Sequence, residues 1–406
     1  MRVARLDAPA RQGSLRRHNL GLVLRELAVA GPLARAELAR RTGLTKATIS
    51  AYVEALQAAG IVEEAPGAAV AVPSRGRPAS PVRLGSGAPV AVGVELGVDF
   101  VSACVTAPTG EVVGMLRTPR DQRSGDPRDR LAEAADDVAG LVASLALGAG
   151  RVVGLGVAFP GVVGPDGRIR SAPNLPGWNG LDVGRGLAAH LGRLGSGERL
   201  VVETGNEADL AALGELWFGE HPELADFALV SAEVGVGAGI VVGGRLFTGA
   251  TGAAGELGHL TVDPDGPACG CGSKGCLERY AGLVALLEGS GTADIGGLRA
   301  AADRGEPRAV SVLARAGTAL GVAAAALVNL LDVPVLVLGG IYAELAPHLA
   351  GPLAAELQIR AVRHLWDPVR LVTARLGAEA AVRGAAGLVH DRVLDDPATY
   401  LPEVLG

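Results

Sequence analysis

Residues 255–278, GELGHLTVDPDGPACGCGSKGCLE, contain one histidine and three of the four cysteines of the chain. The spacing Cys269-x-Cys271-x4-Cys276 after His259 supplies three thiolates and one imidazole, the donor set of a closed tetrahedral zinc site. Three glycines between the cysteines allow the backbone to turn around an ion. Clustered cysteines in a cytoplasmic protein favour a metal over a disulfide, so we predict one structural zinc; free, reduced thiols are the alternative.

Charge is distributed unevenly along the 406 residues. Residues 1–84 hold 13 basic and 6 acidic side chains, whereas the remainder holds 24 and 37. A basic head on an acidic body predicts that only the head binds a polyanion. The most apolar stretch, 320–338, is interrupted by an amide, an acid and a proline, which favours a buried helix and strand over a membrane span. No apolar signal segment follows Met1, so we expect a cytoplasmic protein that makes no membrane contact.

Two patterns of secondary structure divide the chain. Apolar spacing predicts helices at 20–27, 33–41 and 45–59, and the Gly- and Pro-rich stretch 60–88 is typical of a β-wing and a linker. From residue 89 onward strands and helices alternate, which predicts α/β layers with mixed sheets. The expected strands are 89–96, 100–107, 111–117, 152–158, 199–203, 226–233, 236–242, 333–338 and 369–373, and the expected helices are 128–146, 206–217, 306–330, 343–357 and 377–392.

The segment 33–60 has the order of a helix-turn-helix, with a short helix, a glycine turn and a second helix. Ile49, Val53 and Leu56 give the last helix an apolar side, so its opposite side faces outward. Small side chains there allow the helix to enter the major groove of DNA, and an arginine on the preceding helix can bind phosphate. A helical bundle used for protein contacts is the alternative. We predict that double-stranded DNA is contacted by Arg35, Lys46, Ala47, Thr48, Ser50 and Ala51.

A second candidate for DNA contact follows the helices. Residues 74–78 read SRGRP, in which Arg75 and Arg77 flank a glycine. The Arg-Gly-Arg-Pro order resembles the core of an AT-hook, whose two guanidinium groups enter a narrow minor groove. A solvated linker stopped by proline explains the same residues equally well.

Four motifs together resemble the ROK family of repressors, open reading frames and sugar kinases. They are GPLARAELARRTGLTKATIS at 31–50, GRPA at 76–79, GELGH at 255–259 and CGCGSKGCLE at 269–278. The resemblance implies an α/β, two-lobed domain of the actin and hexokinase (ribonuclease H-like) kind, with a sugar site in its cleft, a structural zinc and a homodimer or homotetramer. We therefore expect a winged helix-turn-helix domain at 1–70, a linker at 71–88 and a sugar-kinase-like effector and oligomerisation domain at 89–406.

Kinases of the ROK family hold the phosphates of ATP on two glycine-rich turns, and this sequence departs from both patterns. The first, Asp-x-Gly-Gly-Thr, reads ELGVDF at 95–100, so Val98 replaces a glycine and Asp99 replaces a hydroxyl. The second, Gly-Thr-Gly-x-Gly, reads EVGVG at 233–237, which adds a further carboxylate. A carboxylate about 4 Å from a phosphate repels it by a few kcal/mol, and a β-branched residue resists unusual backbone angles. We therefore do not expect ATP to bind.

The catalytic base of these kinases lies in an Asn-Asp-Ala-Asn motif, which reads NEAD at 206–209. Glu207 keeps a carboxylate at the base position, but its extra methylene displaces that group by about 1 Å, which can cost on the order of 100-fold in rate. The sugar side is better preserved, since carboxylates and amides suit adjacent hydroxyls. By the resemblance, the sugar contacts are Asn174, Asn206, Glu207, Glu256, His259 and Glu278; the alternative for Glu256 and Glu278 is an ordinary surface loop.

Three hypotheses of function follow from these residues. The leading one is a DNA-binding repressor that binds a sugar effector without phosphorylating it, so that no catalytic residue is assigned. The second is an active, ATP-dependent sugar kinase that also binds DNA. The third is a zinc-stabilised assembly protein without an effector. Consumption of ATP in the presence of a hexose favours the second, and failure of every sugar to change stability favours the third.

Overall fold

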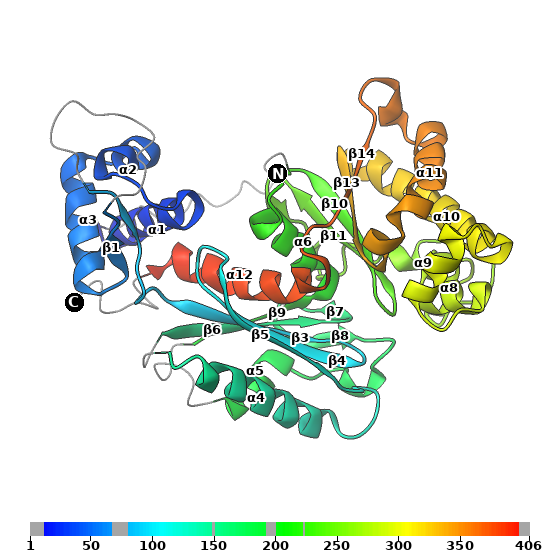
Figure 1. Cartoon of the computed structure of the whole chain (residues 1–406), viewed down its shortest axis with the longest axis horizontal. Coiled ribbons are helices and arrows are strands. Elements are labelled where there is room, and N and C mark those ends of the chain that lie inside the picture. Colours follow the sequence, from blue (N-terminus) through cyan, green and yellow to red (C-terminus); the bar gives the residue numbers. More distant parts are fainter. Residues whose placement is uncertain (1–11, 67–79, 148–150, 192–199, 222–223, 398–406) are drawn as a thin grey trace, which may run out of the picture.

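A small head and two larger lobes make up the molecule (Figure 1). The computed structural model describes residues 12–66, 80–147, 151–191, 200–221 and 224–397. The head lies at one end of the long axis beside the first lobe, and helices α8 to α11 of the second lobe lie at the other end. This arrangement agrees with the predicted α/β two-lobed fold preceded by a helix-turn-helix domain.

The head is a three-helix unit with a two-stranded wing. Thr45 caps the third helix, because its hydroxyl accepts a hydrogen bond from the Thr48 amide at 3.2 Å. Gly43, with φ of 73°, ends the second helix in the left-handed conformation that glycine adopts readily. The elements are α1 (Gln12–Ala30), α2 (Arg35–Thr42), α3 (Lys46–Ala58), β1 (Val62–Glu64) and β2 (Val82–Leu84).

Strand β2 corrects the predicted boundary of the head. It lies inside the range 71–88 that the sequence assigned to a linker, yet it pairs antiparallel with β1. The Leu33 amide, just before α2, donates a hydrogen bond to the Val82 carbonyl at 2.9 Å. Because β2 is hydrogen-bonded to β1 and to the connection between α1 and α2, the head extends to Leu84.

Each lobe contains a five-stranded mixed sheet, and the two sheets have the same topology. The first three strands of each lobe form an antiparallel meander, and two later strands add in parallel beside its first strand. In space the orders are β5-β4-β3-β6-β9 and β12-β11-β10-β13-β14. The strands are β3 (Val90–Leu96), β4 (Phe100–Thr106), β5 (Val112–Pro119), β6 (Val152–Phe159) and β9 (Val201–Asn206), then β10 (Phe227–Ala232), β11 (Val236–Val242), β12 (Arg245–Leu246), β13 (Val335–Gly340) and β14 (Arg370–Thr373).

Several further elements cover the sheets and border the cleft. A small hairpin, β7 (Val162–Val163) and β8 (Ile169–Ser171), follows β6. The helices of the lobes are α4 (Pro127–Ser144), α5 (Val183–His190), α6 (Glu207–Phe218), α7 (Glu278–Ala281), α8 (Leu283–Ser290), α9 (Ile295–Asp303), α10 (Pro307–Leu331), α11 (Ile341–Arg360) and α12 (Ala380–Asp395), with single 3-10 turns at Pro176–Trp178, Leu257–His259, Val362–Leu365 and Gly377–Glu379.

Helices α6 and α12 join the two lobes. Helix α6 follows the first sheet in sequence but packs on β11 of the second lobe, whereas α12 follows the second sheet and packs on β3 and β6 of the first. The two helices also contact each other closely. A Cβ on Gly384 would lie 1.8 Å from the Leu210 carbonyl oxygen, so only glycine permits this approach.

The longest apolar helix belongs to a core. Helix α10 is long and apolar enough to cross a membrane by length and composition alone. In this structure its apolar residues, among them Leu313, Leu320 and Leu327, are buried against α11 and the second sheet. The helix is therefore the packed core helix that the interrupted apolar stretch predicted.

Helix α12 also contacts the head. The Arg25 guanidinium of α1 donates to the Asp391 carboxylate at 2.8 Å and to the Asp395 carboxylate at 2.6 Å. A Cβ on Gly21 would lie 2.2 Å from the Leu394 carbonyl oxygen, so the backbones of α1 and α12 are in close contact at this glycine. The same helix thus contacts the sheet of the first lobe, α6 and the head.

Candidate functional site

A cavity between the lobes brings together all six side chains that the sequence predicted as sugar contacts. It contains about 770 Å³ of space, part of it open to solvent. Loops after β6 and β8 border it on one side, and the loops 233–237 and 252–259 border it on the other. Its walls include Asn174, Asn206, Glu207, Glu256, His259 and Glu278.

Asn206 has most of its hydrogen-bonding capacity occupied by the protein. Its side-chain oxygen accepts hydrogen bonds from the amides of Ala208 at 2.8 Å and Asp209 at 3.2 Å, which caps α6. Its Nδ2 donates to the Gly161 carbonyl at 3.0 Å. Asn206 therefore fixes the start of α6 against the loop after β6, and only one N–H is left for a ligand.

The cavity is acidic. Burial raises the pKa of the Glu207 carboxyl to about 8, and the charges of Glu233 and Glu256 act in the same direction. Burial likewise raises the pKa of Glu256, which His259 lowers and Glu278 raises further. Among the described residues that line the cavity there is no lysine or arginine. A ligand here meets hydrogen-bond acceptors and protonated carboxyls rather than fixed positive charge.

The absence of a side chain at Gly235 keeps one part of the cavity open. A Cβ there would lie 3.0 Å from Glu278 Oε2 and 3.6 Å from Asn174 Nδ2. A side chain at this position would therefore occupy the space between two of the predicted sugar contacts.

The two altered phosphate turns adopt ordinary backbone angles. Within the described ranges, the non-glycine residues with positive φ are Ala146, Glu220 and Asp332, so neither Val98 nor Asp99 is strained. The expectation that the β-branch of Val98 would meet unusual angles is therefore not met. Val98 is instead buried at the cavity wall, and the Arg117 guanidinium carbon lies 3.5 Å from the Phe100 ring centroid. The turns therefore depart from the kinase pattern in side-chain bulk and charge, not in backbone strain.

A cluster of three carboxylates lies beside the cavity. Oxygens of Glu95, Glu207 and Glu233 all lie within 4.8 Å of one another. In the sequence these residues lie in three separate motifs, so their proximity was not predicted. Only the fold brings the end of β3, the start of α6 and the loop after β10 together.

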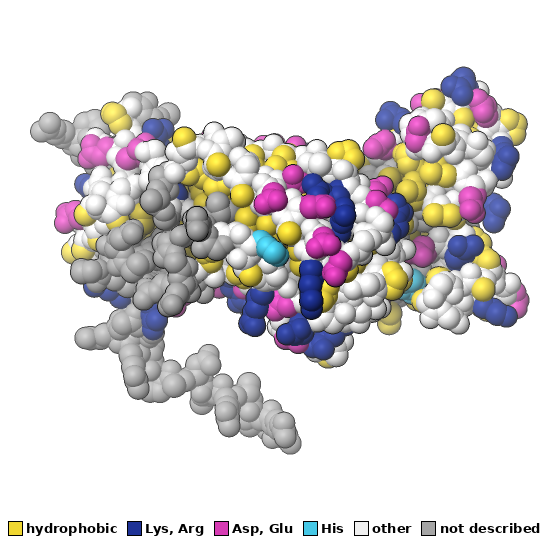
Figure 2. Space-filling model, turned by 90° about the horizontal axis from the view of Figure 1, so that it is seen from below, with side chains coloured by type: hydrophobic (Ala, Val, Ile, Leu, Met, Phe, Trp, Pro, Cys, Tyr) yellow, Lys and Arg dark blue, Asp and Glu magenta, His cyan; other side chains and the backbone are white. Residues whose placement is uncertain are grey.

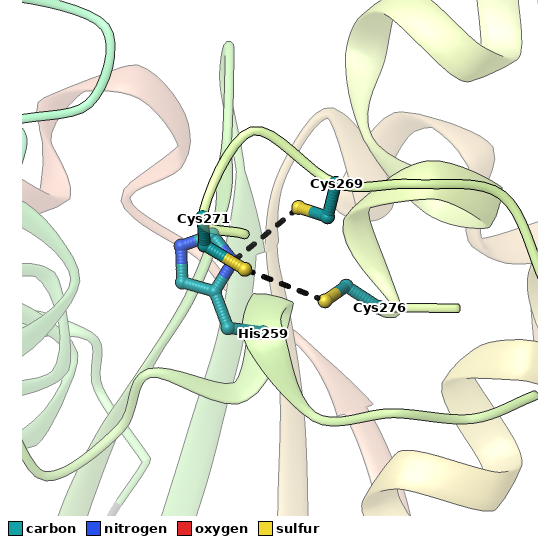
Figure 3. A group of neighbouring side chains, drawn as sticks. All are labelled: His259, Cys269, Cys271 and Cys276. Carbon is teal, nitrogen blue, oxygen red and sulfur yellow. Dashed lines mark hydrogen bonds between the residues drawn. The ribbon is translucent and has the colours of Figure 1, made fainter. Parts of the chain in front are cut away.

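The predicted metal ligands converge (Figure 3). His259 Nδ1 lies 3.8 Å from Cys269 Sγ, and Cys271 Sγ lies 3.7 Å from Cys276 Sγ. Sulfurs placed about 2.3 Å from an ion at tetrahedral angles would lie about 3.7–3.8 Å apart, so these donors fit zinc. One ligand atom from each of the four residues lies within 4.8 Å of the others.

His259 links the cysteine cluster to the cavity. Its Nδ1 faces Cys269, while its Nε2 lies 4.0 Å from Glu256 Oε2 on the cavity side. The two predictions made for this residue, a metal ligand and a sugar-side group, are therefore compatible. A metal bound at Nδ1 would fix the imidazole and, through it, the environment of Glu256.

The predicted DNA-contacting face of α3 is only partly exposed. Lys46, Ala47 and Ala51 are exposed, while Thr48 and Ser50 are half-buried. The Arg35 Nη2 donates to the Gln57 side chain at 3.2 Å and so joins α2 to α3. This bond uses one of the five N–H donors of the guanidinium, so phosphate contact by Arg35 stays a prediction.

The face of the body seen in Figure 2 does not have the charge pattern of a DNA-binding surface. On the face in Figure 2, acidic and basic side chains of the lobes are intermixed rather than segregated. Arg75 and Arg77, the AT-hook-like pair, lie outside the described residues. Within the described part of the chain, the candidate nucleic-acid contacts are therefore those of the helical head.

Comparison with known families agrees with this division. The sequence model of the ROK family matches residues 91–392, and that of the MarR family matches residues 21–69. The first match covers the two lobes, and the second covers the helices of the head.

Individual relatives fall into two kinds. The xylose repressor of Bacillus subtilis (strain 168) is 28% identical over 393 residues, which are 95% of this chain and 98% of the repressor. A glucokinase of Halalkalibacterium halodurans is 30% identical over 325 residues, which are 74% of this chain and 95% of the kinase. The crystal structure of a ROK family transcriptional regulator, a homologue of the MLC protein of E. coli, has a TM-score of 0.80 at 26% identity and covers 97% of this chain and 100% of its own. The similarity to the repressor and the regulator thus includes the head, whereas the similarity to the glucokinase leaves about a quarter of this chain unmatched.

Proposed function

The chain belongs to the ROK family, and we propose that it is a repressor that binds operator DNA through its head and releases it when a sugar enters the cleft. The observation that carries the proposal is the cavity, where six sugar-suited side chains line one space while Val98, Glu95 and Glu233 lie at the turns that would hold phosphates. The head can thus bind DNA while the cleft binds a sugar, so one chain has two separate sites for ligands of different chemistry.

The effector in this proposal is an unphosphorylated, uncharged sugar or an amino sugar. Carboxyls and amides can bond neighbouring hydroxyl groups, and a protonated Glu207 can donate as well as accept. A phosphate or a sugar acid would meet only negative or neutral walls, because no basic side chain is among the described lining residues. Sugars described for relatives, such as the xylose of the Bacillus subtilis repressor, are the first to test.

Sugar phosphorylation is not part of the proposed function. In the absence of a neighbouring cation, the raised pKa keeps Glu207 protonated near neutral pH, and a protonated carboxyl cannot accept the proton of a sugar hydroxyl. The kinase hypothesis remains the second candidate because the glucokinase of Halalkalibacterium halodurans is 30% identical. A coupled assay for ATP consumption separates the two.

Helix α12 is the proposed route from the cleft to the head. Its first residues, Ala380 and Ala381, line the pocket that contains Glu95 and Glu207, and its last turns bind Arg25 of α1. The helix packs on α6 with a backbone contact at Gly384, so the pair moves as a unit. Closure of the lobes on a sugar would therefore turn the end of α12 and reorient the head.

A structural zinc and an oligomeric state complete the proposal. Zinc bound by His259, Cys269, Cys271 and Cys276 would hold the loop between Glu256 and Glu278 in place. The protein acts as a homodimer or homotetramer in the cytoplasm, where two heads contact a symmetric operator.

The proposal is tested by selecting bound duplexes from a random library and measuring operator affinity with and without sugars. We expect a two-fold symmetric site with half-site centres one or more helical turns apart, released by a neutral sugar and not by its phosphate ester. Replacing Lys46 and Ser50 together by alanine should weaken specific binding. Unselective DNA binding, or steady ATP turnover near about 1–100 per second, would reject the repressor function in favour of the alternatives.

A further inference from the structure

A second cavity lies next to the one that the predicted sugar contacts line. It contains about 1360 Å³ of space, part of it open to solvent. Its walls come from the turn after β7 and the end of β9 in the first lobe, from the segment 246–252 in the second lobe, and from both α6 and α12. An occupant would therefore contact both lobes and the two helices that join them.

Two close contacts separate the cavities. Among the described residues, Asn206 and Gly252 line both of them. The Asn206 Nδ2 donates to the Gly161 carbonyl at 3.0 Å, and a Cβ on Gly252 would lie 2.3 Å from the Val163 carbonyl oxygen. These contacts hold the start of α6 and the segment 246–252 against the chain that follows β6, so the second cavity is a site of its own.

The side chain of Asp209 is buried in the wall of the second cavity without a partner. Only 5% of the residue is exposed, and its Oδ1 accepts no hydrogen bond from the described residues. Burial raises the pKa of this carboxyl to about 7, and the charge of Glu256 acts in the same direction. A buried carboxylate without a counter-charge is costly, so the free oxygen of Asp209 points to a ligand in this cavity.

The other charged side chains of the described wall are already paired. The pairs are Arg185 with Asp182 at 3.5 Å, Arg392 with Glu203 at 2.9 Å and Asp166 with Arg170 at 2.9 Å. Within the described wall, Asp209 is therefore the one charged group that lacks an ion pair, and the two arginines are not free to bind an anion without losing their partners.

We propose that this cavity binds a small organic cation, a primary amine with a short aliphatic body, whose ammonium group pairs with Asp209. One uncompensated carboxylate calls for one positive charge, whereas a divalent metal ion needs several oxygen ligands and the remaining carboxylates are paired with arginines. The same wall offers apolar surface for the body of the amine. Its larger apolar residues are Val163, Val202, Leu210, Leu213, Leu246 and Leu388.

The charge at this position is a feature of this chain. The Asn-Asp-Ala-Asn motif of the kinases has an asparagine where this sequence has Asp209. An asparagine side chain would be neutral in the same place, and its burial would call for no counter-charge. The attraction for an amine therefore arises from the departure from the motif.

An amine in this cavity would also lie against the helix that contacts the head. Leu388 and Arg392 of α12 line the cavity, and the neighbouring Asp391 and Asp395 bind Arg25 of α1. If the chain acts as the proposed repressor, on which this step rests, the amine would be a second effector whose site is separate from that of the sugar.

Binding is measured on the full chain in its zinc-loaded form, with n-butylamine as the probe. Isothermal titration calorimetry gives the number bound, and thermal unfolding reports the stability gained. We expect about one butylamine per chain with a millimolar or lower dissociation constant, because so few atoms can supply only a limited affinity. Butan-1-ol has a body of the same length without the charge and should bind at least about tenfold more weakly. Neither DNA nor sugar is needed, so failure of the repressor function would leave this result unchanged.

An asparagine variant assigns the site. Asp209→Asn keeps the side-chain shape and restores the residue of the kinase motif, so it should fold, yet it should weaken butylamine binding by at least about tenfold. Asp136→Asn is the matched control, because it removes one negative charge from an exposed position on α4 and should bind as tightly as the wild type. Absence of butylamine binding at tens of millimolar, equal binding of butan-1-ol, or undiminished binding in Asp209→Asn would overturn the proposal.

Discussion

Among single residues, Glu207 has an environment that strongly alters its protonation. Its pKa of about 8 arises first from burial and then from Glu233 and Glu256. Near pH 4.5 and below, the carboxyl is protonated in both the folded and the unfolded chain. Between there and about pH 8 only the folded chain keeps the proton, so this carboxyl makes the protein less stable as the pH rises.

Glu207→Gln should remove that loss of stability. In buffer free of divalent cations, the variant and the wild type should have the same melting temperature near pH 5. Near pH 8 the variant should melt at least about 2 °C higher, which is the shift that about 1 kcal/mol gives in a domain of this size. Calorimetry at the two pH values measures the difference. The exposed Glu111→Gln is the control and should follow the wild type at both. An equal difference at pH 5 and pH 8 would mean that the carboxyl is not protonated by its surroundings.

Glu256 is the residue at which sugar binding and DNA binding should separate. It lines the cavity and lies 4.0 Å from His259, far from the head. Glu256→Ala should abolish the effect of sugar on operator affinity while operator affinity itself stays within about twofold, because distant sites are nearly independent. Titration of operator release with sugar is the measurement. The exposed Asp265→Ala, on the same loop, should respond normally, and a fully responsive Glu256→Ala would remove Glu256 from the sugar site.

The residues of the cleft show what a motif can predict. The positions of Asn174, Asn206, Glu256 and Glu278 on one cavity follow from matching short motifs. The motifs do not predict that the Asn206 side chain caps α6 and donates to the Gly161 carbonyl, because the second bond depends on a loop that is distant in sequence. The cluster that includes Glu95 was missed for the same reason: each glutamate looks like an isolated substitution until two sheets are placed side by side.

Among the elements, the loop between Glu256 and Glu278 depends on its metal. Cys271 is exposed, yet its sulfur faces Cys276 at 3.7 Å. Cys271→Ser should reduce the zinc content below the roughly one ion per chain expected for the wild type, and with it the thermal stability and the sugar response. Metal analysis and thermal unfolding check this. Ser273→Ala in the same loop should keep both, and a stable, responsive protein without zinc would contradict a structural role.

The contact between α1 and α12 should transmit the response to sugar. Arg25 binds Asp391 and Asp395 through side chains that are one-third or more exposed, so the pairs contribute only about 0.2–1 kcal/mol each to stability. Arg25→Gln should therefore leave folding and operator binding nearly intact but reduce the change in operator affinity that sugar causes. Arg304→Gln, which breaks the exposed pair with Glu306 in the second lobe, is the control. An unreduced sugar effect in Arg25→Gln would exclude this contact as the route.

Most helices and strands could be predicted, and the exceptions have physical causes. The long helices α4, α10 and α12 and the strands of both sheets, except the two-residue edge strand β12, follow from apolar periodicity within a few residues. The helices α5 and α7 to α9 were missed because they are short, between 4 and 9 residues, and give too few turns for an apolar period. Strand β2 was assigned to a linker because its three residues become a strand only by pairing with β1.

At the scale of the whole molecule, the shared topology of the two sheets could not be anticipated from the sequence. The two lobes have the same strand order but no repeated sequence motif, since a sheet constrains only the alternation of apolar residues. The exchange of α6 and α12 between lobes likewise depends on long-range contacts. The exchange of these two helices joins the two similar lobes into one unit, and the cleft lies at the junction between them.

An exposed apolar patch is the structural support for the proposed oligomer. At the far end of the second lobe, Asn329 accepts a hydrogen bond from the Val362 amide at 2.9 Å, which joins the end of α10 to the turn after α11. Large apolar side chains around this junction face solvent. They are Leu330, Ile359, Val362, Leu365 and Trp366, which are 83%, 77%, 58%, 82% and 64% exposed.

A second copy of this chain is the partner that we expect to cover the patch. A group of exposed large apolar side chains close together in the fold is typical of an interface, and a symmetric operator requires two heads. Trp366→Glu should yield monomers in analytical ultracentrifugation and should weaken binding to the full operator by on the order of 100-fold, because the second head loses its effective concentration. Affinity for an isolated half-site should not change, since the head folds apart from this end of the molecule (Figure 1). Val310→Glu, at another partly exposed apolar position, should keep the oligomer. A Trp366→Glu variant that still sediments as an oligomer would move the interface elsewhere on the chain.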